Sequence, residues 1–388
     1  MKRYLAVILC VIIIVIGLAS CNNGENPEIL SFIPENDDNS RSIADLCASK
    51  KNITVGFIGG SVTEGNTYSA SFVEYLSETY PDNNFTQKNV GIGGTTSVFG
   101  VHRIDDQLVQ YNPDIVFVEF SVNDSSDKVE IYSQCMEGII RKILRNDAGT
   151  LIVFVGTGNS TYVSNYENGT LPEIVAAHMA VAEHYNVPYI NVGKELLTHI
   201  SNSEEDDWYY YFQDGVHTNS NGGAFYSDVM EQYLSDYKFD IKYKEEPLTS
   251  NDFENADLFD SRNYLTEPWV VRSNDMLGKI SEYNHCLYSK EVGATLEFDF
   301  HGTLFGFYCR FDNDSGILEY SIDGGEWKQY SLYSDFYTIH GKELVGFADV
   351  EYGLENTKHH IVLRISEDKN PESRGNTISI GAFTFSGE

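Results

Sequence analysis

The segment 52–65, NITVGFIGGSVTEG, decides the fold. It begins with Ile53–Ile58, a compact β-branched and aromatic run that is typical of a buried parallel strand. A glycine-flanked serine, Ser61, follows directly. Open α/β sheets place their functional groups at the carboxyl ends of parallel strands, so the pattern predicts an α/β fold with Ser61 at that edge. On this motif alone, a phosphate-binding turn or a plain tight turn is an equal alternative.

Strand and helix patterns continue to alternate as far as Ile200. Three further apolar runs predict strands of the same sheet, at 115–120, 151–155 and 188–192. Helices are predicted at 69–80, 101–111, 132–145, 172–185 and 222–237. Repeated units of this kind predict a three-layer α/β domain with a mainly parallel sheet, over residues 46–240.

The composition changes after Tyr237. Runs rich in strand-forming residues, separated by turn residues, follow at 294–300, 304–311, 317–322, 360–365 and 377–385. Asp323-Gly324-Gly325 between two such runs is a strong hairpin signal. We therefore expect an all-β sandwich domain over 260–388, joined by a polar linker at 241–259.

The N-terminus has the pattern of a signal peptide. Lys2 and Arg3 precede an apolar run, and Leu18-Ala19-Ser20-Cys21 follows it. These last four residues resemble the bacterial lipobox, which implies a signal peptide at 1–20 and acylation of Cys21. An ordinary signal peptide with an incidental cysteine is the alternative. Residues 21–45 are predicted to be a flexible tether, and the protein is predicted to be lipid-anchored on the extracellular face of a bacterial membrane.

The charge and the cysteine content limit which molecules and ions the protein can bind. The net charge of −32 becomes −34 once Lys2 and Arg3 are removed, and such a surface repels nucleic acid. The remaining cysteines form no CxxC or Cys/His cluster, so we expect no metal site. Cys286 and Cys309 can form a disulfide or stay free, and the sequence leaves both open.

Three further motifs carry polar groups that suit catalysis. The glycine-rich turn at 89–96 frees the backbone to present the N–H of Gly94, although a flexible turn has the same composition. Asn123 follows the strand at 115–120, where its amide can donate to an oxyanion or simply form a turn. Asp214 lies three residues before His217, a spacing that lets the carboxylate orient the imidazole.

Taken in order, these motifs resemble the SGNH, or GDSL-type, hydrolase family. The resemblance spans about 52–237 and implies a flavodoxin-like fold and a cofactor-free serine esterase. It implies Ser61 as nucleophile, His217 and Asp214 as base and orienting acid, and the oxyanion donors Ser61, Gly94 and Asn123. Gly60 stands where many members have Asp, and Ser121 replaces the Gly of Gly-x-Asn-Asp. These two departures put the subfamily and substrate in doubt more than the activity.

The sequence indicates the substrate less directly than it indicates the reaction. A tethered esterase with an appended β-sandwich resembles bacterial enzymes that remove acetyl groups from polysaccharides, so we expect an acylated carbohydrate or a small ester as substrate. Aromatic side chains of the second domain can bind sugars or pack in its core. Tyr209–Phe212 can line the substrate cleft or pack beside it. A broad short-chain esterase or lipase, an acyltransferase and a non-catalytic glycan-binding lipoprotein are the alternatives. Most other histidines are predicted to be surface or capping residues.

Overall fold

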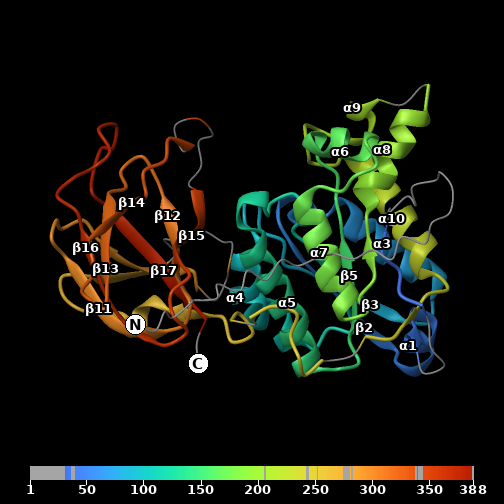
Figure 1. The fold of residues 1–388 in the computed structure, drawn as a ribbon, viewed down its shortest axis with the longest axis horizontal. Coiled ribbons are helices and arrows are strands. Elements are labelled where there is room, and N and C mark those ends of the chain that lie inside the picture. The colour runs from blue at the N-terminus through green and yellow to red at the C-terminus, as the bar shows by residue number, and fades with distance from the viewer. Residues whose placement is uncertain are drawn as a thin grey trace, which may run out of the picture.

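The computed structural model describes residues 31–35, 40–204, 207–241, 244–250, 252–273, 280, 283–336, 339 and 344–386. The predicted signal peptide at 1–20 and the predicted lipidation site at Cys21 lie outside these residues. The described chain forms an α/β part followed by a part built of strands, and the two lie next to each other in Figure 1.

A parallel sheet forms the centre of the α/β part. Within the described residues it has five strands in the order β3-β2-β4-β5-β6, and each neighbouring pair is parallel. Its strands are β2 (Asn52–Gly59), β3 (Asn84–Asn89), β4 (Ile115–Glu119), β5 (Leu151–Val155) and β6 (Tyr189–Ile190). The four apolar runs therefore form strands, as predicted. The apolar pattern misses β3, because this edge strand is polar and has one neighbour.

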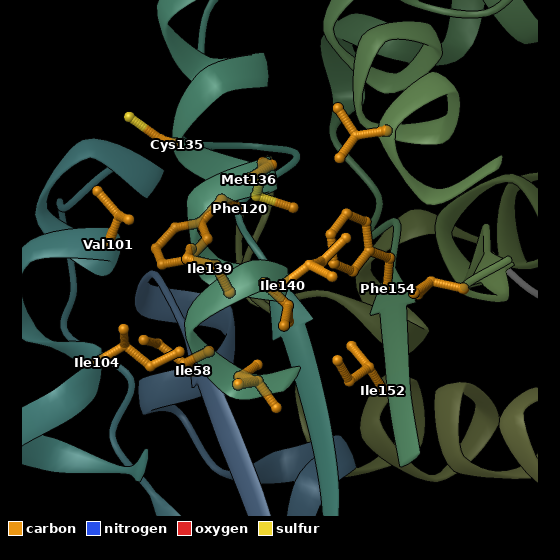
Figure 2. Close-up of a cluster of buried hydrophobic side chains, with 14 of the residues drawn as sticks. Ile58, Val101, Ile104, Phe120, Cys135, Met136, Ile139, Ile140, Ile152 and Phe154 are labelled. Atoms are coloured by element: carbon orange, nitrogen blue, oxygen red, sulfur yellow. The ribbon is translucent and has the colours of Figure 1, made fainter. Parts of the chain in front are cut away.

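Helices cover both faces of this sheet. Successive strand residues point to opposite faces, so Phe117 packs into one layer and Val118 into the other. The layer of Phe117 contains α1 (Ile43–Ser49), α3 (Thr67–Thr79), α8 (Val192–Asn202) and α10 (Ser220–Leu234). The layer of Val118 contains α4 (Ser97–Gln107), α5 (Val129–Asn146) and α7 (Glu173–His184). Figure 2 shows this second layer, with side chains of α4 and α5 packed on those of the sheet. This is the predicted three-layer fold.

The helix α8 corrects one boundary of the prediction. The sequence pattern assigns Val192 to a strand, but in the structure β6 ends at Ile190 and Val192 begins the helix. The side chain of Asn191 accepts a hydrogen bond from the N–H of Lys194 at 3.1 Å. This N-cap starts the helix and ends the strand.

Short elements complete the α/β part. They are α2 (Ser61–Glu64), α6 (Val163–Glu167), α9 (Trp208–Tyr211), β1 (Arg41–Ser42), β7 (Lys238–Phe239), and 3₁₀ turns at Val109–Tyr111, Ser126–Lys128 and Ser160–Tyr162. Phe32 exchanges two backbone hydrogen bonds with Tyr189 of β6, at 2.9 and 2.8 Å. Phe32, β1 and the start of α1 all fall within the predicted tether at 21–45, so the fold holds these parts of the segment.

Two antiparallel sheets form the second part. In the described residues, one has the order β15-β12-β17-β10-β9 with β8 also paired to β17, and the other has the order β11-β16-β13-β14. Their facing side chains form one apolar core, so the predicted sandwich is confirmed. The strands are β8 (Asp257–Asp260), β9 (Val270–Ser273), β10 (His285–Ser289), β11 (Thr295–His301), β12 (Leu304–Phe311), β13 (Ile317–Ile322), β14 (Lys328–Ser331), β15 (Leu344–Tyr352), β16 (Lys358–Ile365) and β17 (Ile378–Phe385), with a 3₁₀ turn at Ser261–Tyr264.

The sandwich contains the predicted hairpin turn and the two cysteines, Cys286 and Cys309. Asp323 and Gly324 have φ values of 54° and 69°, the positive values that a type I′ hairpin turn needs, and β13 and β14 pair antiparallel on either side. Cys286 and Cys309 are buried free thiols. They lie on β10 and β12, which β17 separates, so the question that the sequence left open is settled as free thiols.

The two parts share a packed interface. Phe99 of α4 is fully buried and stacks on Tyr308 and Phe347, with ring centroids 5.5 and 5.0 Å apart. Figure 1 shows α4 and α5 on the side of the α/β part that faces the sandwich. The chain between the parts also packs: the carboxylate of Glu137 accepts from the backbone N–H of Leu248 at 2.6 Å. The described residues of the predicted linker are therefore held on α5.

Candidate active site

Ser61 begins α2 at the carboxyl end of β2. The two residues before it have no room for a side chain. A Cβ on Gly59 would lie 2.4 Å from the backbone oxygen of Glu119, and one on Gly60 would lie 2.0 Å from Oδ1 of Asn123. Both distances are far inside van der Waals contact. Gly59 would meet backbone and therefore requires glycine, whereas a side chain at Gly60 would have to displace the side chain of Asn123. In this structure the Asn123 side chain fills the space beside Gly60, where many members of the resembled family carry Asp.

His217 and Asp214 approach Ser61 from the loop between α9 and α10. Nε2 of His217 lies 2.8 Å from Oγ of Ser61, and Nδ1 of His217 lies 2.7 Å from Oδ2 of Asp214. The hydroxyl, the imidazole and the carboxylate thus form one continuous hydrogen-bonded chain. The Ser61–His217 distance is within the reach that a nucleophile and its base need.

The neighbours of Asp214 keep its carboxylate ionised. Oδ1 accepts from the N–H groups of Val216 at 2.8 Å and His217 at 2.9 Å. Burial acts to raise the pKa of Asp214, but these hydrogen bonds and the one from the His217 ring outweigh it and lower the pKa to about 2. At neutral pH the carboxylate therefore accepts the Nδ1 proton, which leaves Nε2 as the acceptor facing the serine.

The loop that carries these two residues is itself fixed. The indole N–H of Trp208 donates to the backbone oxygen of Asp214, and the indole stacks on Phe212 with centroids 3.9 Å apart. The hydroxyls of Thr218 and Thr67 lie 2.7 Å apart and join the loop to α3. These contacts hold the loop that carries the imidazole.

The glycine turn that carries Gly94 passes close to Ser61. A Cβ on Gly93 would lie 3.4 Å from Cβ of Ser61, and the N–H of Gly93 donates to Oε2 of Glu64 at 3.0 Å. Gly94 follows with φ of 73° and open space at its Cβ position, a conformation that favours glycine. The side chain of Asn123 lies beside Gly60, the residue that precedes Ser61.

Residues 57–224 match the model of the GDSL-like Lipase/Acylhydrolase family. The α/β part of the chain belongs to this family. The matched range of this GDSL domain contains all five predicted site residues of the α/β part. Acylhydrolases cleave acyl esters, so the chain is an enzyme that acts on carboxylic ester bonds. No protein of curated function matches the sequence.

Two solved structures match nearly the whole chain. One is a crystal structure of a two-domain esterase (CEX) active on acetylated mannans, co-crystallized with mannopentaose; it has a TM-score of 0.76 and 22% identity, over 90% of this chain and 96% of that chain. The other is a crystal structure of a two-domain esterase (CEX) active on acetylated mannans, with a TM-score of 0.74 and 22% identity, over 89% of this chain and 94% of that chain. At this identity the likeness shows a shared fold, in which a β part follows the GDSL domain.

A buried pair behind Asn123 was not anticipated. Asp124 accepts from the N–H of Ser97 at 2.8 Å, and its other oxygen lies 3.0 Å from Nε2 of His178. The side chains of Asp124 and His178 are 0% and 1% exposed. The prediction that such histidines are surface or capping residues is wrong here, and also for His102, His285 and His359, which are buried. The fold supplies acidic partners for His178, His285 and His359 from distant segments, which spacing along the chain does not reveal.

A second buried carboxylate lies below the turn that starts α2. Glu119 is fully buried and accepts from the hydroxyls of Thr157 at 2.8 Å and Thr63 at 3.2 Å. Burial raises the pKa of Glu119 to about 7, although these hydrogen bonds act to lower it. Ser121, the departure from the family pattern, accepts from the N–H of Thr157 at 3.0 Å and joins the ends of β4 and β5.

The aromatic run before Asp214 divides into two pairs. Tyr211 and Phe212 are buried in the core of the GDSL domain, whereas Tyr209 and Tyr210 are 72% and 51% exposed. Tyr211 and Phe212 therefore pack in the core, and lining of the substrate cleft stays a prediction for Tyr209 and Tyr210.

Two kinds of feature are absent from the described residues, a metal-binding cluster and a membrane-spanning helix. No three His, Cys, Asp or Glu side chains in them lie close enough together to hold a metal ion. None of the helices that the structure describes combines the length and the apolar content needed to cross a membrane.

Proposed function

We propose that this chain is a serine esterase that removes acetyl groups from an extracellular polysaccharide. The observation that carries the proposal is the hydrogen-bonded chain from Ser61 through His217 to Asp214. Its three groups are the ones that an acyl-enzyme mechanism uses as nucleophile, general base and orienting acid.

In the first half of the reaction, Oγ of Ser61 attacks the ester carbonyl while Nε2 of His217 takes the hydroxyl proton. Asp214 accepts the Nδ1–H and stabilises the imidazolium that forms. The N–H groups of Ser61 and Gly94 and the side-chain amide of Asn123 donate to the oxyanion of the tetrahedral intermediate.

In the second half, the intermediate expels the sugar hydroxyl, which receives the proton from His217. This step leaves an acyl-enzyme on Ser61. His217 then takes a proton from water, the hydroxide attacks the acyl carbonyl, and acetate leaves as the serine regains its proton. A sugar hydroxyl in place of water would give acyl transfer instead of hydrolysis.

Three features support a neutral polysaccharide as substrate. Tyr209 and Tyr210 present exposed rings close in sequence to His217, and aromatic rings offer flat apolar faces to sugars. The acidic surface disfavours anionic polymers. The solved structures that share both parts of the fold are of esterases active on acetylated mannans.

Lipid anchoring is a separate part of the proposal. The residues Leu18-Ala19-Ser20-Cys21 support acylation of Cys21 and display of the enzyme on the outer side of a bacterial membrane. In a bacterial host, labelling with a fatty-acid analogue should mark the wild type and fail to mark Cys21→Ala, which should leave the membrane fraction. Equal labelling of both proteins would refute the anchor.

The catalytic proposal is tested by acetate release from p-nitrophenyl acetate, acetylated mannan and acetylated xylan. The proteins compared are the wild type, Ser61→Ala and the control Ser77→Ala. Ser77 lies on α3, and its hydroxyl donates to the Val73 carbonyl at 2.8 Å. We expect Ser77→Ala to match the wild type and Ser61→Ala to lose at least about 10³-fold in kcat.

Each outcome decides between named functions. Release from a polysaccharide that depends on Ser61 supports the full proposal. Release from p-nitrophenyl acetate alone would leave a short-chain esterase. Equal inactivity of all three proteins would favour a glycan-binding role, and appearance of acetylated sugar acceptors in place of acetate would indicate an acyltransferase.

A further inference from the structure

The carboxyl group of Asp124 joins three segments of the GDSL domain. Asp124 directly follows Asn123, the proposed oxyanion donor after β4. Its Oδ1 accepts from the backbone N–H of Ser97, the first residue of α4, at 2.8 Å. Its Oδ2 lies 3.0 Å from Nε2 of His178, in the middle of α7. One carboxyl group therefore holds the loop after β4, the start of α4 and the interior of α7.

Asp124 also serves as the cap of α4 from a distant part of the chain. The first backbone N–H groups of a helix need acceptors from outside the helix. In the described part of the chain, the side chain of the N-cap residue Thr96 makes no such hydrogen bond. Asp124, 27 residues after Ser97, supplies the acceptor instead. Because the side chains of Asp124 and His178 are buried, water does not replace a lost partner, and loss of either contact is costly.

The contact with Ser97 anchors the glycine turn that carries Gly94. Ser97 follows Gly94 by three residues. Between them, the hydroxyl of the buried Thr95 donates to the backbone oxygen of Ile92 at 2.7 Å and closes the turn. The chain from Ile92 to Ser97 is thus held internally by Thr95 and externally by Asp124. The N–H of Gly94 lies within this stretch.

Asp124 likewise anchors the turn that carries Asn123. The backbone N–H groups of Asn123 and Asp124 both donate to the carbonyl of Phe120 at 3.0 Å, so residues 120–124 form one turn. Oδ1 of Asn123 is buried and has no hydrogen-bond partner among the described residues. Because no hydrogen bond holds this oxygen, the position of the amide depends on the turn itself. The carboxyl group of Asp124 fixes that turn to α4 and α7.

We propose that Asp124 is a positioning residue that sets the distance between the N–H of Gly94 and the amide of Asn123, and that His178 holds Asp124 in place. The inference rests on the proposed function, which assigns these two donors to the oxyanion hole. Such donors must converge on one oxygen, yet these two come from separate loops, after β3 and β4. With one oxygen on Ser97 and the other on His178, the carboxyl group does not rotate, so the two loops keep their separation.

The experiment measures hydrolysis of p-nitrophenyl acetate by Asp124→Ala, Asp124→Asn and His178→Ala, and their inhibition by methylboronic acid, which forms a tetrahedral adduct with a catalytic serine. In Asp124→Ala we expect kcat to fall by roughly 100-fold with KM unchanged within a few-fold, because loss of an oxyanion donor has effects of that size. The inhibition constant of the boronic acid should rise as kcat falls. Asparagine can accept from Ser97 and donate to His178, so Asp124→Asn should retain more kcat. His178→Ala keeps the contact with Ser97 and should also lose less.

Two double variants test through which groups Asp124 acts. In the background of Asn123→Ala the amide is already absent, so Asp124→Ala should cost less kcat there than in the wild type. His178→Ala should add little to Asp124→Ala, because its effect passes through the carboxyl group. Fold-losses that multiply in either pair would overturn the proposal. So would a lowered melting temperature in Asp124→Ala with kcat and the inhibition constant unchanged.

The control Ser42→Ala removes the cap of another helix. The hydroxyl of Ser42 accepts from the N–H of Asp45 at 3.0 Å at the start of α1. This helix precedes the amino end of β2, whereas Ser61 follows its carboxyl end. Ser42→Ala should lower the melting temperature and leave kcat unchanged.

Two further outcomes are decisive. If Asp124→Ala does not fold, wild-type kcat and inhibition constants in both Asp124→Asn and His178→Ala would overturn the proposal. Failure of the proposed function is distinct, since Ser61→Ala would then match the wild type.

Discussion

Glu119 is expected to make the folded protein less stable as the pH rises from about 4.5 to about 7. The ordinary pKa of the group is 4.5, and burial raises it to about 7 in the fold. Within that interval the folded protein binds the proton more tightly than the unfolded chain, so the free energy of unfolding falls with rising pH. Below the interval the carboxyl is protonated in both states, and above it the carboxyl is ionised in both.

The size of the effect follows from the width of the interval. Each pH unit within it lowers the free energy of unfolding by about 1.4 kcal/mol, which gives a total loss of about 3 kcal/mol. Of the charged groups near Glu119, Asp124 adds to the effect by repulsion. Tyr68 and Tyr226 stay neutral, because burial raises their pKa values. Burial lowers the pKa of Arg103 to about 9, so its charge is constant across the interval.

Glu119→Gln isolates this contribution, because glutamine does not titrate and the other groups act alike in both proteins. Urea unfolding of the wild type and the variant at about pH 4.5 and about pH 8 measures both free energies of unfolding. We expect the variant to gain about 3 kcal/mol on the wild type between the two pH values. A difference between the proteins that is the same at both would refute the reasoning.

Three other substitutions have defined outcomes. Asp214→Asn should lower kcat by about 10⁴-fold with melting temperature nearly unchanged, because the amide does not hold the imidazole in the required tautomer; a loss below about 10-fold would contradict the triad. Gly60→Ala puts a methyl 2.0 Å from Asn123 Oδ1, so kcat should fall at least about 10-fold, and wild-type kinetics would contradict the tight turn. Phe99→Ala should lower the free energy of unfolding by about 3–5 kcal/mol. Urea unfolding checks this value, and a loss below about 1 kcal/mol would mean that the interface contributes little.

The sequence predicts those parts of the fold whose residues are buried along their whole length. β4 and β5 are buried at each position because helices cover both faces of the sheet, and all of their residues except Glu119 are apolar. Such an apolar run can be recognised in the sequence. The edge strand β3 is polar because part of it meets water, and so it lacks the pattern. At Asn191 a local hydrogen bond starts helix α8 and thereby ends the strand. A pattern of apolar residues does not reveal this hydrogen bond, so the sequence extends the strand too far.

The residues in and around the site also differ in how well the sequence predicts them. Ser61, Asn123 and His217 follow recognisable local patterns, and the shared edge of a parallel sheet explains why they meet. Arg103 and Glu119 carry no such signal, because one lies in an amphipathic helix and the other ends an apolar strand. Their contacts arise only in the fold, which brings Arg103 to the backbone oxygen of Gly59 and Glu119 to the hydroxyls of Thr63 and Thr157. Sequence patterns therefore locate the reacting groups better than the groups that hold them.

Glu119 and Glu137, two buried glutamates of the GDSL domain, differ in their effect on stability. Glu137 holds the chain between the two parts, and Arg141 reaches it through the hydroxyl of Tyr185, with hydrogen bonds of 3.1 and 2.6 Å. Glu119 receives its hydrogen bonds from neutral groups and becomes unfavourable for the fold once it ionises. We therefore expect Glu137→Gln to lower stability at about pH 8, and Glu119→Gln to gain stability on the wild type as the pH rises. A stability of Glu119→Gln that falls relative to the wild type as the pH rises would mean that Glu119 is a structural carboxylate like Glu137.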